Sequence, residues 1–454
     1  MRIFLVSANR ESEPYPVAPL GISYVAGAAR ADGHEVDLLD LCFSKNIEGD
    51  IDRAVRRFAP ELIGISIRNV DNLTYPASVS YLDDIQQAAT ALVRASRAPI
   101  VAGGAGFSIF PDRMLSILGV ELGIIGEGEE AFCLLARHVA EGREVPNLPN
   151  LIRLGEDARH VKRKLAPFVG NGLPARDLVD NARYLELGGM ANLQTKRGCP
   201  FRCTYCTYQH INGPSLRLRS PTEVVDELAL MVEDSGLDEV FFVDDIFNWP
   251  HEHAMGICTE IMARRIRVSW TCFATPLAMT PDLARAMKSA GCRGVEFGTD
   301  TASPSMLRSL GKPFQLEQIR LASYACREAG LPDAHYLVFG GPGETSETMA
   351  ETFAFFDDLK PRAVLAFPGI RIYPNTPLRG FAISDGAISE ADDLLLPRFY
   401  ISPRIGADEL KTAVGSHAES RPNWVVPGLG IRSDPALLAA LRRIGCRGPL
   451  WDLL

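Results

Sequence analysis

The chain has 454 residues and a formal net charge of −9, with 46% hydrophobic and 23% charged residues. This composition indicates a globular protein of two or three domains and excludes disordered and fibrous chains. Lysine and arginine are scattered without a basic stripe, which argues against a nucleic-acid partner. No apolar run approaches the ~18 residues of a membrane span, and the short apolar start is expected to be a strand rather than a signal peptide.

Residues 1–141 alternate short apolar runs with helical patterns. Five strands are expected, at 3–7, 35–39, 62–67, 99–102 and 122–125. The expected helices are 20–31, 51–58, 75–96, 111–118 and 129–141. Five such βα units predict an α/β domain with a doubly wound, flavodoxin-like or Rossmann-like parallel sheet. Ligands of such sheets bind at the carboxyl ends of the strands.

Glycine-rich turns lie at those carboxyl ends. Gly103-Gly104-Ala105-Gly106 follows the fourth strand, Gly126-Glu127-Gly128-Glu129 follows the fifth, and Pro19-Leu20-Gly21 opens the first helix. Glycine lets the backbone approach a ligand closely, although many α/β turns carry a glycine pair for steric reasons alone. As a set, the turns resemble those of cobalamin-binding domains. The cobalamin contacts that this resemblance implies are Pro19, Leu20, Gly21, Ser66, Arg68, Asn69, Gly103, Gly104, Gly126, Glu127, Gly128 and Glu129.

The chain departs from many cobalamin-binding domains in the loop after its first strand. That loop, 8–18, contains no histidine, so no histidine ligand to cobalt is expected. Asp32-Gly33-His34 imitates the usual D-x-H-x-x-G pattern one helix later, and His34 is interpreted as a turn residue. In the resembling family the cobalamin then lies against the loop after the third strand, which places Arg68 and Asn69 at its lower face. The alternative for Arg68 is a salt bridge at the domain interface.

The range 142–190 lacks a clear period and is expected to be a linker that packs against both domains. The βα alternation then resumes over 191–383. Strands are expected at 192–196, 239–243, 268–273, 294–298, 334–339 and 364–372, and helices at 221–235, 251–265, 281–290, 316–329 and 345–359. Six units predict a partial (β/α)6 barrel with its active site at the carboxyl ends of the strands. Residues 384–454 are expected to be a small C-terminal extension that either covers the substrate or only packs on the barrel.

Three cysteines, Cys199, Cys203 and Cys206, follow the first strand of the predicted barrel. Three thiolates in one loop can hold three irons of a [4Fe–4S] cluster and leave the fourth iron open to a small molecule. A zinc site completed by His210 is the alternative, because zinc prefers four ligands. The spacing C-x-x-x-C-x-x-C resembles the radical S-adenosylmethionine (SAM) superfamily, in which the open iron chelates SAM. With no secretory signal, the sparse cysteines also favour a reducing cytoplasm over a disulfide framework.

The later strands end in polar or glycine-rich segments, in the order typical of that superfamily. Asp244-Asp245 stands where the family binds the SAM ammonium group, which a carboxylate suits by charge-assisted hydrogen bonding. Gly298-Thr299-Asp300 stands where the family usually shows Gly-x-Glu-Ser, so the contact of Asp300 is an open point. The SAM contacts that the resemblance implies are Tyr205, Asp244, Asp245, Gly298, Thr299, Asp300, Gly340, Gly341 and Arg371.

Over roughly residues 1–380, the chain is identified as a member of the cobalamin-dependent radical SAM family. The resemblance implies a methyltransferase for an unactivated carbon of a small molecule or peptide, acting through a 5′-deoxyadenosyl radical and methylcobalamin. It also implies an external one-electron reductant of the flavodoxin or ferredoxin type. The alternatives are cyclisation, ring contraction or oxidation with the same cofactors, a radical SAM enzyme without cobalamin, and a sensor without turnover. The sequence singles out neither the substrate nor a proton acceptor, and Cys272, His335 and Tyr336 are expected to lie in the core.

Overall fold

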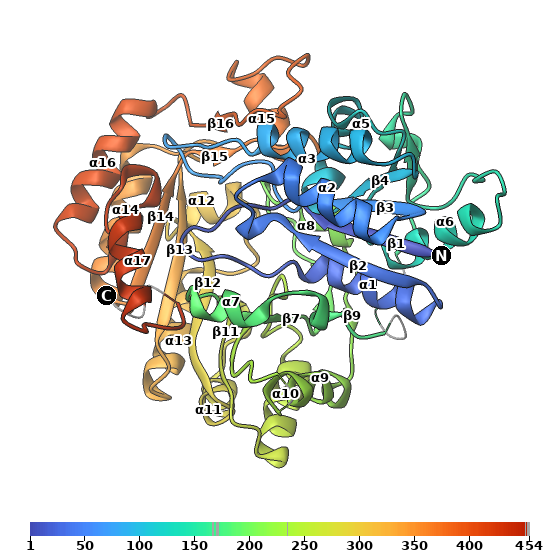
Figure 1. Ribbon diagram of the computed structural model, residues 1–454. Coiled ribbons are helices and arrows are strands. Elements are labelled where there is room, and N and C mark those ends of the chain that lie inside the picture. Colours follow the sequence, from blue (N-terminus) through green and yellow to red (C-terminus); the bar gives the residue numbers. More distant parts are fainter. Residues whose placement is uncertain (166–167, 169–171, 234, 450, 452–454) are drawn as a thin grey trace.

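The structure is a computed structural model that describes residues 1–454 except 166–167, 169–171, 234, 450 and 452–454. It contains two main parallel sheets, one in each half of the chain, with helices packed around them (Figure 1). The α/β fold class expected from the sequence is confirmed. Within the described residues, no helix combines the length and the apolar character that crossing a membrane requires.

The first sheet has six strands in the order β2-β1-β3-β4-β5-β6. Its strands are β1 (Arg2–Ser7), β2 (Glu35–Asp40), β3 (Leu62–Ser66), β4 (Ile100–Gly103), β5 (Leu122–Ile124) and β6 (Leu151–Arg153). The first five pair in parallel, and β6 is antiparallel to β5. Because both faces of a parallel sheet are covered, its central strands β1 and β3 are almost continuously buried.

Helices cover both faces of this sheet. They are α1 (Leu20–Ala31), α2 (Ile47–Phe58), α3 (Leu82–Ala95), α4 (Ala105–Ile109), α5 (Pro111–Leu118) and α6 (Glu129–Ala140). Helices α1 and α6 pack on one face, and α2, α3 and α5 pack on the other. The prediction of a helix from residue 75 was wrong for its first turns. Residues 71 and 80 instead form an antiparallel bridge, and α3 begins at Leu82.

The second sheet has seven parallel strands in the order β17-β14-β13-β12-β11-β10-β7. They are β7 (Ala191–Leu193), β10 (Glu239–Phe242), β11 (Ser269–Ala274), β12 (Cys292–Asp300), β13 (Asp333–Phe339), β14 (Ala363–Pro368) and β17 (Trp424–Val425). Six of these strands match the predicted units in order. The seventh comes from the C-terminal extension, where Trp424 pairs with Val364 at the outer edge of the sheet.

Two predicted strands of this half are divided. The first, at 192–196, splits into β7 and β8 (Lys196–Arg197), and β8 pairs with β9 (Arg217–Leu218) outside the main sheet. The last, at 364–372, breaks at Gly369, which has a φ of 73°. After this break, β15 (Ile370–Arg371) pairs with β16 (Phe399–Tyr400). After each division the chain contacts the first domain, through Arg197 with Glu129 in one case and Arg371 with Asp71 in the other.

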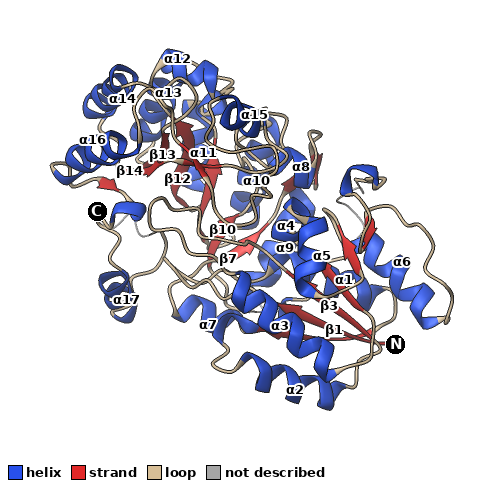
Figure 2. Ribbon diagram, turned by 90° about the horizontal axis from the view of Figure 1, so that it is seen from above, coloured by secondary structure: helices blue, strands red, loops and turns tan. Residues whose placement is uncertain are grey.

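The remaining helices surround the second sheet, link the halves or follow it. They are α7 (Asn181–Glu186), α8 (Tyr208–Asn212), α9 (Pro221–Glu233), α10 (His251–Arg264), α11 (Pro281–Ser289), α12 (Pro304–Ser309), α13 (Leu316–Glu328), α14 (Ser346–Leu359), α15 (Pro377–Ser384), α16 (Ala407–Glu419) and α17 (Pro435–Arg443). Seen from above, α4 and α8 lie where the two halves meet (Figure 2). One apolar core crosses this junction, since Ile211, Leu310 and Ile370 cluster with residues of α2, α3 and α5.

Candidate functional site

A cavity of about 420 Å³ lies between the two sheets. Its walls come from the carboxyl ends of strands in both halves. Ser7, Ser66 and Gly103 contribute from the first sheet, and Val243 and Phe273 from the second. The meeting of two sets of strand ends at one cavity makes it the candidate functional site, because ligands of parallel sheets bind at such ends.

Most of the residues predicted to contact cobalamin line this cavity. Those that line it are Pro19, Leu20, Gly21, Ser66, Arg68, Gly103, Gly104, Gly126, Glu127, Gly128 and Glu129. Asn69 is not among the lining residues, and its amide Nδ2 donates to the carbonyl of Asp71 at 3.3 Å. Gly104 has a φ of 101°, and a Cβ there would lie 2.4 Å from the carbonyl oxygen of Ile67. This turn therefore needs glycine for both conformation and space.

The walls of the cavity suit a large ligand with both apolar and amide groups. Three buried polar atoms of lining residues have no partner among the described residues: Asn9 Oδ1, Tyr24 OH and Asn192 Oδ1. Buried polar atoms normally have hydrogen-bond partners, so these three atoms can bond to a ligand or to water. The deeper wall is apolar and includes Leu5 and Phe132. The residues present therefore fit a corrinoid, which combines a flat apolar ring with many amide side chains.

Arg68 projects into this cavity without an ion pair among the described residues. Its side chain is accessible, yet protein surrounds it closely enough that loss of hydration lowers the pKa of the guanidinium. The nearest groups that raise this pKa are the phenols of Tyr208, Tyr15 and Tyr184 and the thiol of Cys42, none of them a carboxylate. The alternative of an interdomain salt bridge is therefore not seen among the residues that the structure describes. Arg68 brings a positive charge to the wall of the cavity.

The two glutamates of the Gly126–Glu129 turn point toward the second domain. Arg217 Nη1 donates to Glu127 Oε2 at 2.6 Å, and Arg197 Nη2 donates to Glu129 Oε1 at 2.6 Å. Burial opposes ionisation of Glu129, but Arg197 outweighs it and lowers the pKa of this carboxyl. Both glutamate side chains therefore form interdomain ion pairs, and both residues also line the cavity. Their contact with cobalamin stays a prediction.

The loop of three cysteines is held by backbone contacts from several elements. The amide of Cys199 donates to the carbonyl of Gly213 at 3.1 Å, and the amide of Thr204 donates to Leu310 at 3.0 Å. Burial raises the pKa of Cys199 to about 11 and that of Cys206 to about 12, and the thiolate of Cys203 raises both. Cys199 is buried, Cys203 and Cys206 are partly buried, and binding of iron must expel their protons.

The zinc alternative depended on His210, which lies on α8. Its Nε2 is 3.1 Å from the carbonyl oxygen of Ser108 in the first domain. The Nε2 atom that donates to this carbonyl carries a proton and is therefore not available as a zinc ligand. Among the described residues, no three His, Cys, Asp or Glu side chains form a site for a single metal ion. The donor set of three enclosed thiols fits a cluster that takes one thiolate for each of three irons.

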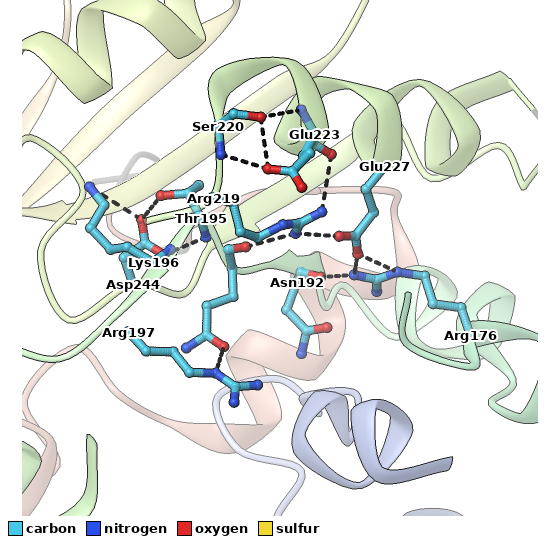
Figure 3. A network of polar contacts seen from close by, with 11 residues as sticks. Arg176, Asn192, Thr195, Lys196, Arg197, Arg219, Ser220, Glu223, Glu227 and Asp244 are labelled. Atoms are coloured by element: carbon cyan, nitrogen blue, oxygen red, sulfur yellow. Dashed lines mark hydrogen bonds and ion pairs between the residues drawn. The ribbon is translucent and has the colours of Figure 1, made fainter. Parts of the chain in front are cut away.

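The structure separates the roles of Asp244 and Asp245. Asp244 is fully buried and accepts hydrogen bonds from the amide of Thr195 at 2.7 Å and from the amide of Lys196 at 3.1 Å (Figure 3). Lys196 in turn donates to three carbonyls of residues 246–249. Asp244 therefore fixes the backbone at the start of β8, the strand that leads into the cysteine loop. It also explains why the predicted strand 192–196 leaves the main sheet after Leu193.

Asp245 faces the cysteines instead. Its carboxylate is 3.3 Å from the amide Nδ2 of Asn212, a residue that lines the cavity. Burial, then the charge of Asp244, raise its pKa to about 7. Its charge also raises the pKa values of Cys199 and Cys206, which places it beside the loop. A lightly partnered carboxylate at this position can accept a ligand ammonium.

Asp300, at the end of β12, is paired with Lys312, which was not predicted as a site residue. Lys312 Nζ donates to Asp300 Oδ2 at 2.7 Å, and the phenol of Tyr205 donates to the same oxygen. The two charged side chains are 7% and 4% exposed. Lys312 follows α12 in a Gly-Lys pair, and no sequence spacing connects that pair to the cysteine loop.

Two family models match the chain. The B12 binding domain model matches residues 7–136, and the Radical SAM superfamily model matches residues 193–356. The first match contains the glycine turns, and the second contains the cysteine loop and the strand ends described above.

The chain combines a B12-binding domain with a radical SAM domain.

Several relatives match most of the chain. Tryptophan 2-C-methyltransferase of Streptomyces laurentii is 27% identical over 79% of this chain and 71% of its own length. An uncharacterised methyltransferase of Pyrococcus horikoshii is 28% identical over 86% of this chain and 84% of its own. The radical SAM methyltransferase TsrM of Kitasatospora setae superposes with a TM-score of 0.88 at 25% identity, covering 99% of this chain and 96% of its own. Its structures contain cobalamin and a [4Fe–4S] cluster, and tryptophan with a SAM analogue.

Three of the residues predicted to contact SAM use their polar groups in hydrogen bonds to other protein groups. Thr299 is buried and its hydroxyl is 2.7 Å from His335 Nδ1, inside the core. The amides of Gly340 and Gly341 both donate to the carboxylate of Glu344. The side chain of Thr299 and these two amides therefore face protein groups. Gly298 remains open, since a Cβ there would meet no atom within 4 Å.

Arg371, also predicted as a SAM contact, has a side chain that is engaged with other protein groups. Its Nε donates to Asp71 Oδ2 at 2.9 Å, and its two terminal nitrogens donate to the carbonyls of Ile372 and Leu394 at 2.7 and 2.8 Å. The guanidinium is 4% exposed. Arg371 thus joins the barrel to the loop after β3 of the first domain.

A buried carboxylate, Glu296, lies inside the barrel. It accepts hydrogen bonds from the phenol of Tyr336 and the indole of Trp451, both at 2.8 Å, and burial raises its pKa. Trp451 belongs to the C-terminal extension and fills the space beside Gly294. The extension therefore packs into the barrel as well as along its edge. His335 contacts Ser323 and Thr299, and Cys272 is fully buried, which confirms both as core residues.

Proposed function

We propose that this protein is a methyltransferase that binds cobalamin, a [4Fe–4S] cluster and SAM, and transfers a methyl group to a carbon atom of a small molecule. The cavity shared by the two domains carries the proposal. Glycine turns for a corrinoid and the strand ends beside the cysteine loop form its opposite walls. The tryptophan methyltransferases among its relatives favour a small substrate over a macromolecule.

The chain's own residues supply binding, orientation and exclusion of water. Cys199, Cys203 and Cys206 would hold the cluster, and Asp245 would accept the SAM ammonium. Arg68 would place a positive charge at the corrinoid's lower face in place of a histidine ligand. When bound, the cluster supplies an electron to SAM, and the corrinoid carries the methyl group that is transferred. The electron requires an external one-electron reductant of the flavodoxin or ferredoxin type.

The test is anaerobic turnover with mass spectrometry. Reconstituted protein is incubated with hydroxocobalamin, methyl-labelled SAM, titanium(III) citrate and tryptophan as a probe substrate. The proposal expects labelled methylcobalamin, retention of corrinoid after desalting, and loss of both SAM chemistry and cluster in the triple Cys199→Ala, Cys203→Ala, Cys206→Ala variant. Cys258→Ala is the matched control, because that cysteine is buried in the core on α10.

The results separate the competing functions. Corrinoid retention with 5′-deoxyadenosine but without labelled methylcobalamin would favour cyclisation or another rearrangement. Deoxyadenosine without corrinoid retention would favour a radical SAM enzyme that has lost cobalamin. Corrinoid binding with neither product, in cluster-loaded protein, would favour a sensor.

A further inference from the structure

Lys312 is a buried cation beside the cysteine loop. Its ammonium is 7% exposed and lies 2.7 Å from Asp300 Oδ2. The phenol of Tyr205, within the loop, donates to the same carboxylate oxygen. Asp300 is therefore held between a residue of the cysteine loop and a lysine from the segment after α12. A buried charge must be compensated in this way, because leaving water is costly for an isolated ammonium.

The backbone fixes the position of this lysine. The amide of Thr204 donates to the carbonyl of Leu310 at 3.0 Å, and the hydroxyl of Thr204 donates to the carbonyl of Ser309 at 2.8 Å. Gly311 has a φ of 69°, and a Cβ there would lie 2.7 Å from the carbonyl oxygen of Arg202. The segment 309–312 is thus packed directly on the segment 202–205. The backbone of Lys312 is therefore fixed beside the cysteine loop, and its ion pair with Asp300 holds the ammonium.

The charge of Lys312 reaches the thiols. Its ammonium is paired with Asp300 Oδ2 at 2.7 Å, and the same carboxylate accepts from the phenol of Tyr205, two residues after Cys203. This ion pair keeps the buried ammonium charged, because an isolated buried ammonium would lose its proton. A fixed positive charge beside the loop stabilises negative charge on its sulfurs.

The reduction potential of an iron–sulfur cluster depends on its net charge, on hydrogen bonds to its sulfurs and on solvent exposure. Reduction adds one negative charge, which a fixed buried cation stabilises. We propose that Lys312 is a positioning residue that holds the Asp300–Tyr205 pair against the cysteine loop and raises the reduction potential of the cluster bound there. This inference rests on the cluster of the proposed function. It adds a residue that determines how readily the external reductant can reduce that cluster.

The experiment is an EPR-monitored redox titration of reconstituted, SAM-free protein, with iron content measured for each variant. Lys312→Met removes the cation, and we expect its reduction equilibrium to fall at least tenfold, which is 59 mV for one electron. Asp300→Asn leaves the lysine uncompensated, so its potential is expected to rise. Lys312→Arg keeps the charge and should stay within threefold of the wild-type reduction equilibrium. Lys288→Met, an exposed lysine on α11, is the control for a change in net charge.

Opposite shifts in Lys312→Met and Asp300→Asn are the signature of an electrostatic role, since mere loosening of the loop would move both potentials in one direction. Shifts of the same sign, or wild-type potentials in both variants, would overturn the inference. If Lys312→Met fails to hold iron, Asp300→Asn decides alone, because it retains the lysine. Failure of the proposed function is distinguishable: the wild-type protein would then assemble no cluster or cleave no SAM, whatever its variants do.

Discussion

At the scale of single residues, the sequence predicted which positions face the site better than what each side chain does there. The cysteines, the glycine turns and the aspartate pair are local patterns, so spacing along the chain was enough to place them. Lys312 and Arg371 depend on partners far away in the sequence, Asp300 with Cys203 in one case and Asp71 in the other. No local pattern encodes such a contact. Lys312 was therefore missed, and the contact of Arg371 with Asp71 was not predicted.

The aspartate pair gives the first prediction. Asp245→Asn should weaken SAM binding about 10- to 100-fold with normal iron content, because it removes a charge-assisted hydrogen bond worth about 1.5–3 kcal/mol. Asp244→Asn should instead lower the melting temperature and the iron content, because Lys196 would lose its buried counter-charge. Equilibrium dialysis of SAM, iron analysis and thermal unfolding measure the three effects. Normal stability of Asp244→Asn together with weakened SAM binding would reverse the two assignments.

At the scale of elements, long periodic segments were predictable and short ones were not. Helices α1 and α5 have the predicted bounds because their apolar faces are encoded locally. The strands β6 and β17 have three and two residues, and each exists only through its neighbour, β5 or β14. The strand β8 pairs with β9 instead of continuing β7 in the main sheet. Short elements are defined by tertiary partners, which periodicity cannot reveal.

The docking of α16 on β17 gives the second prediction. His417 on α16 stacks on Phe353 at a ring-centroid distance of 4.0 Å and contacts Trp424, and burial with Arg421 lowers its pKa to about 4. An unfolded histidine titrates near 6.5, so between pH 6.5 and 4 the unfolded chain binds more protons. Stability conferred by neutral His417 is therefore lost as the pH falls through this window.

The expected loss is about 2 kcal/mol between pH 7.5 and 5, from the shift in pKa. Urea unfolding at both pH values measures it. His417→Phe keeps the aromatic stack without a titrating group, so its unfolding free energy should lose about 2 kcal/mol less than wild type over that interval. His160→Phe, at an exposed position, should keep the wild-type dependence. An unchanged dependence in His417→Phe would count against a buried neutral imidazole.

At the scale of the whole molecule, the two halves were predicted but the way they join was not. The family models and the TsrM superposition agree with the order of the domains. Their interface depends on buried ion pairs and on an apolar core that runs through both. The predicted boundaries at 141, 190 and 383 remain predictions, although β6, within the expected linker, completes the first sheet.

The interface gives the third prediction. Arg371→Met leaves Asp71 fully buried without its counter-charge, which should reduce the free energy of unfolding by about 3–5 kcal/mol. The double variant Asp71→Asn, Arg371→Met removes both charges and should recover part of that loss. Denaturant unfolding measures both, and SAM binding is measured beside it. Weakened SAM binding with unchanged stability would instead support the original assignment of Arg371 to SAM.

The ion pair between β8 and the first domain limits how the domains of such proteins can be exchanged. Arg197 stands one residue before Gly198-Cys199, and its carboxylate partner Glu129 belongs to the other domain. A chimera that takes its first domain from a relative without the acidic turn would bury Arg197 with no counter-ion, next to the first ligand of the cluster. The acidic turn and the basic strand must therefore be inherited together, and a graft that separates them should assemble cluster poorly even if both halves fold.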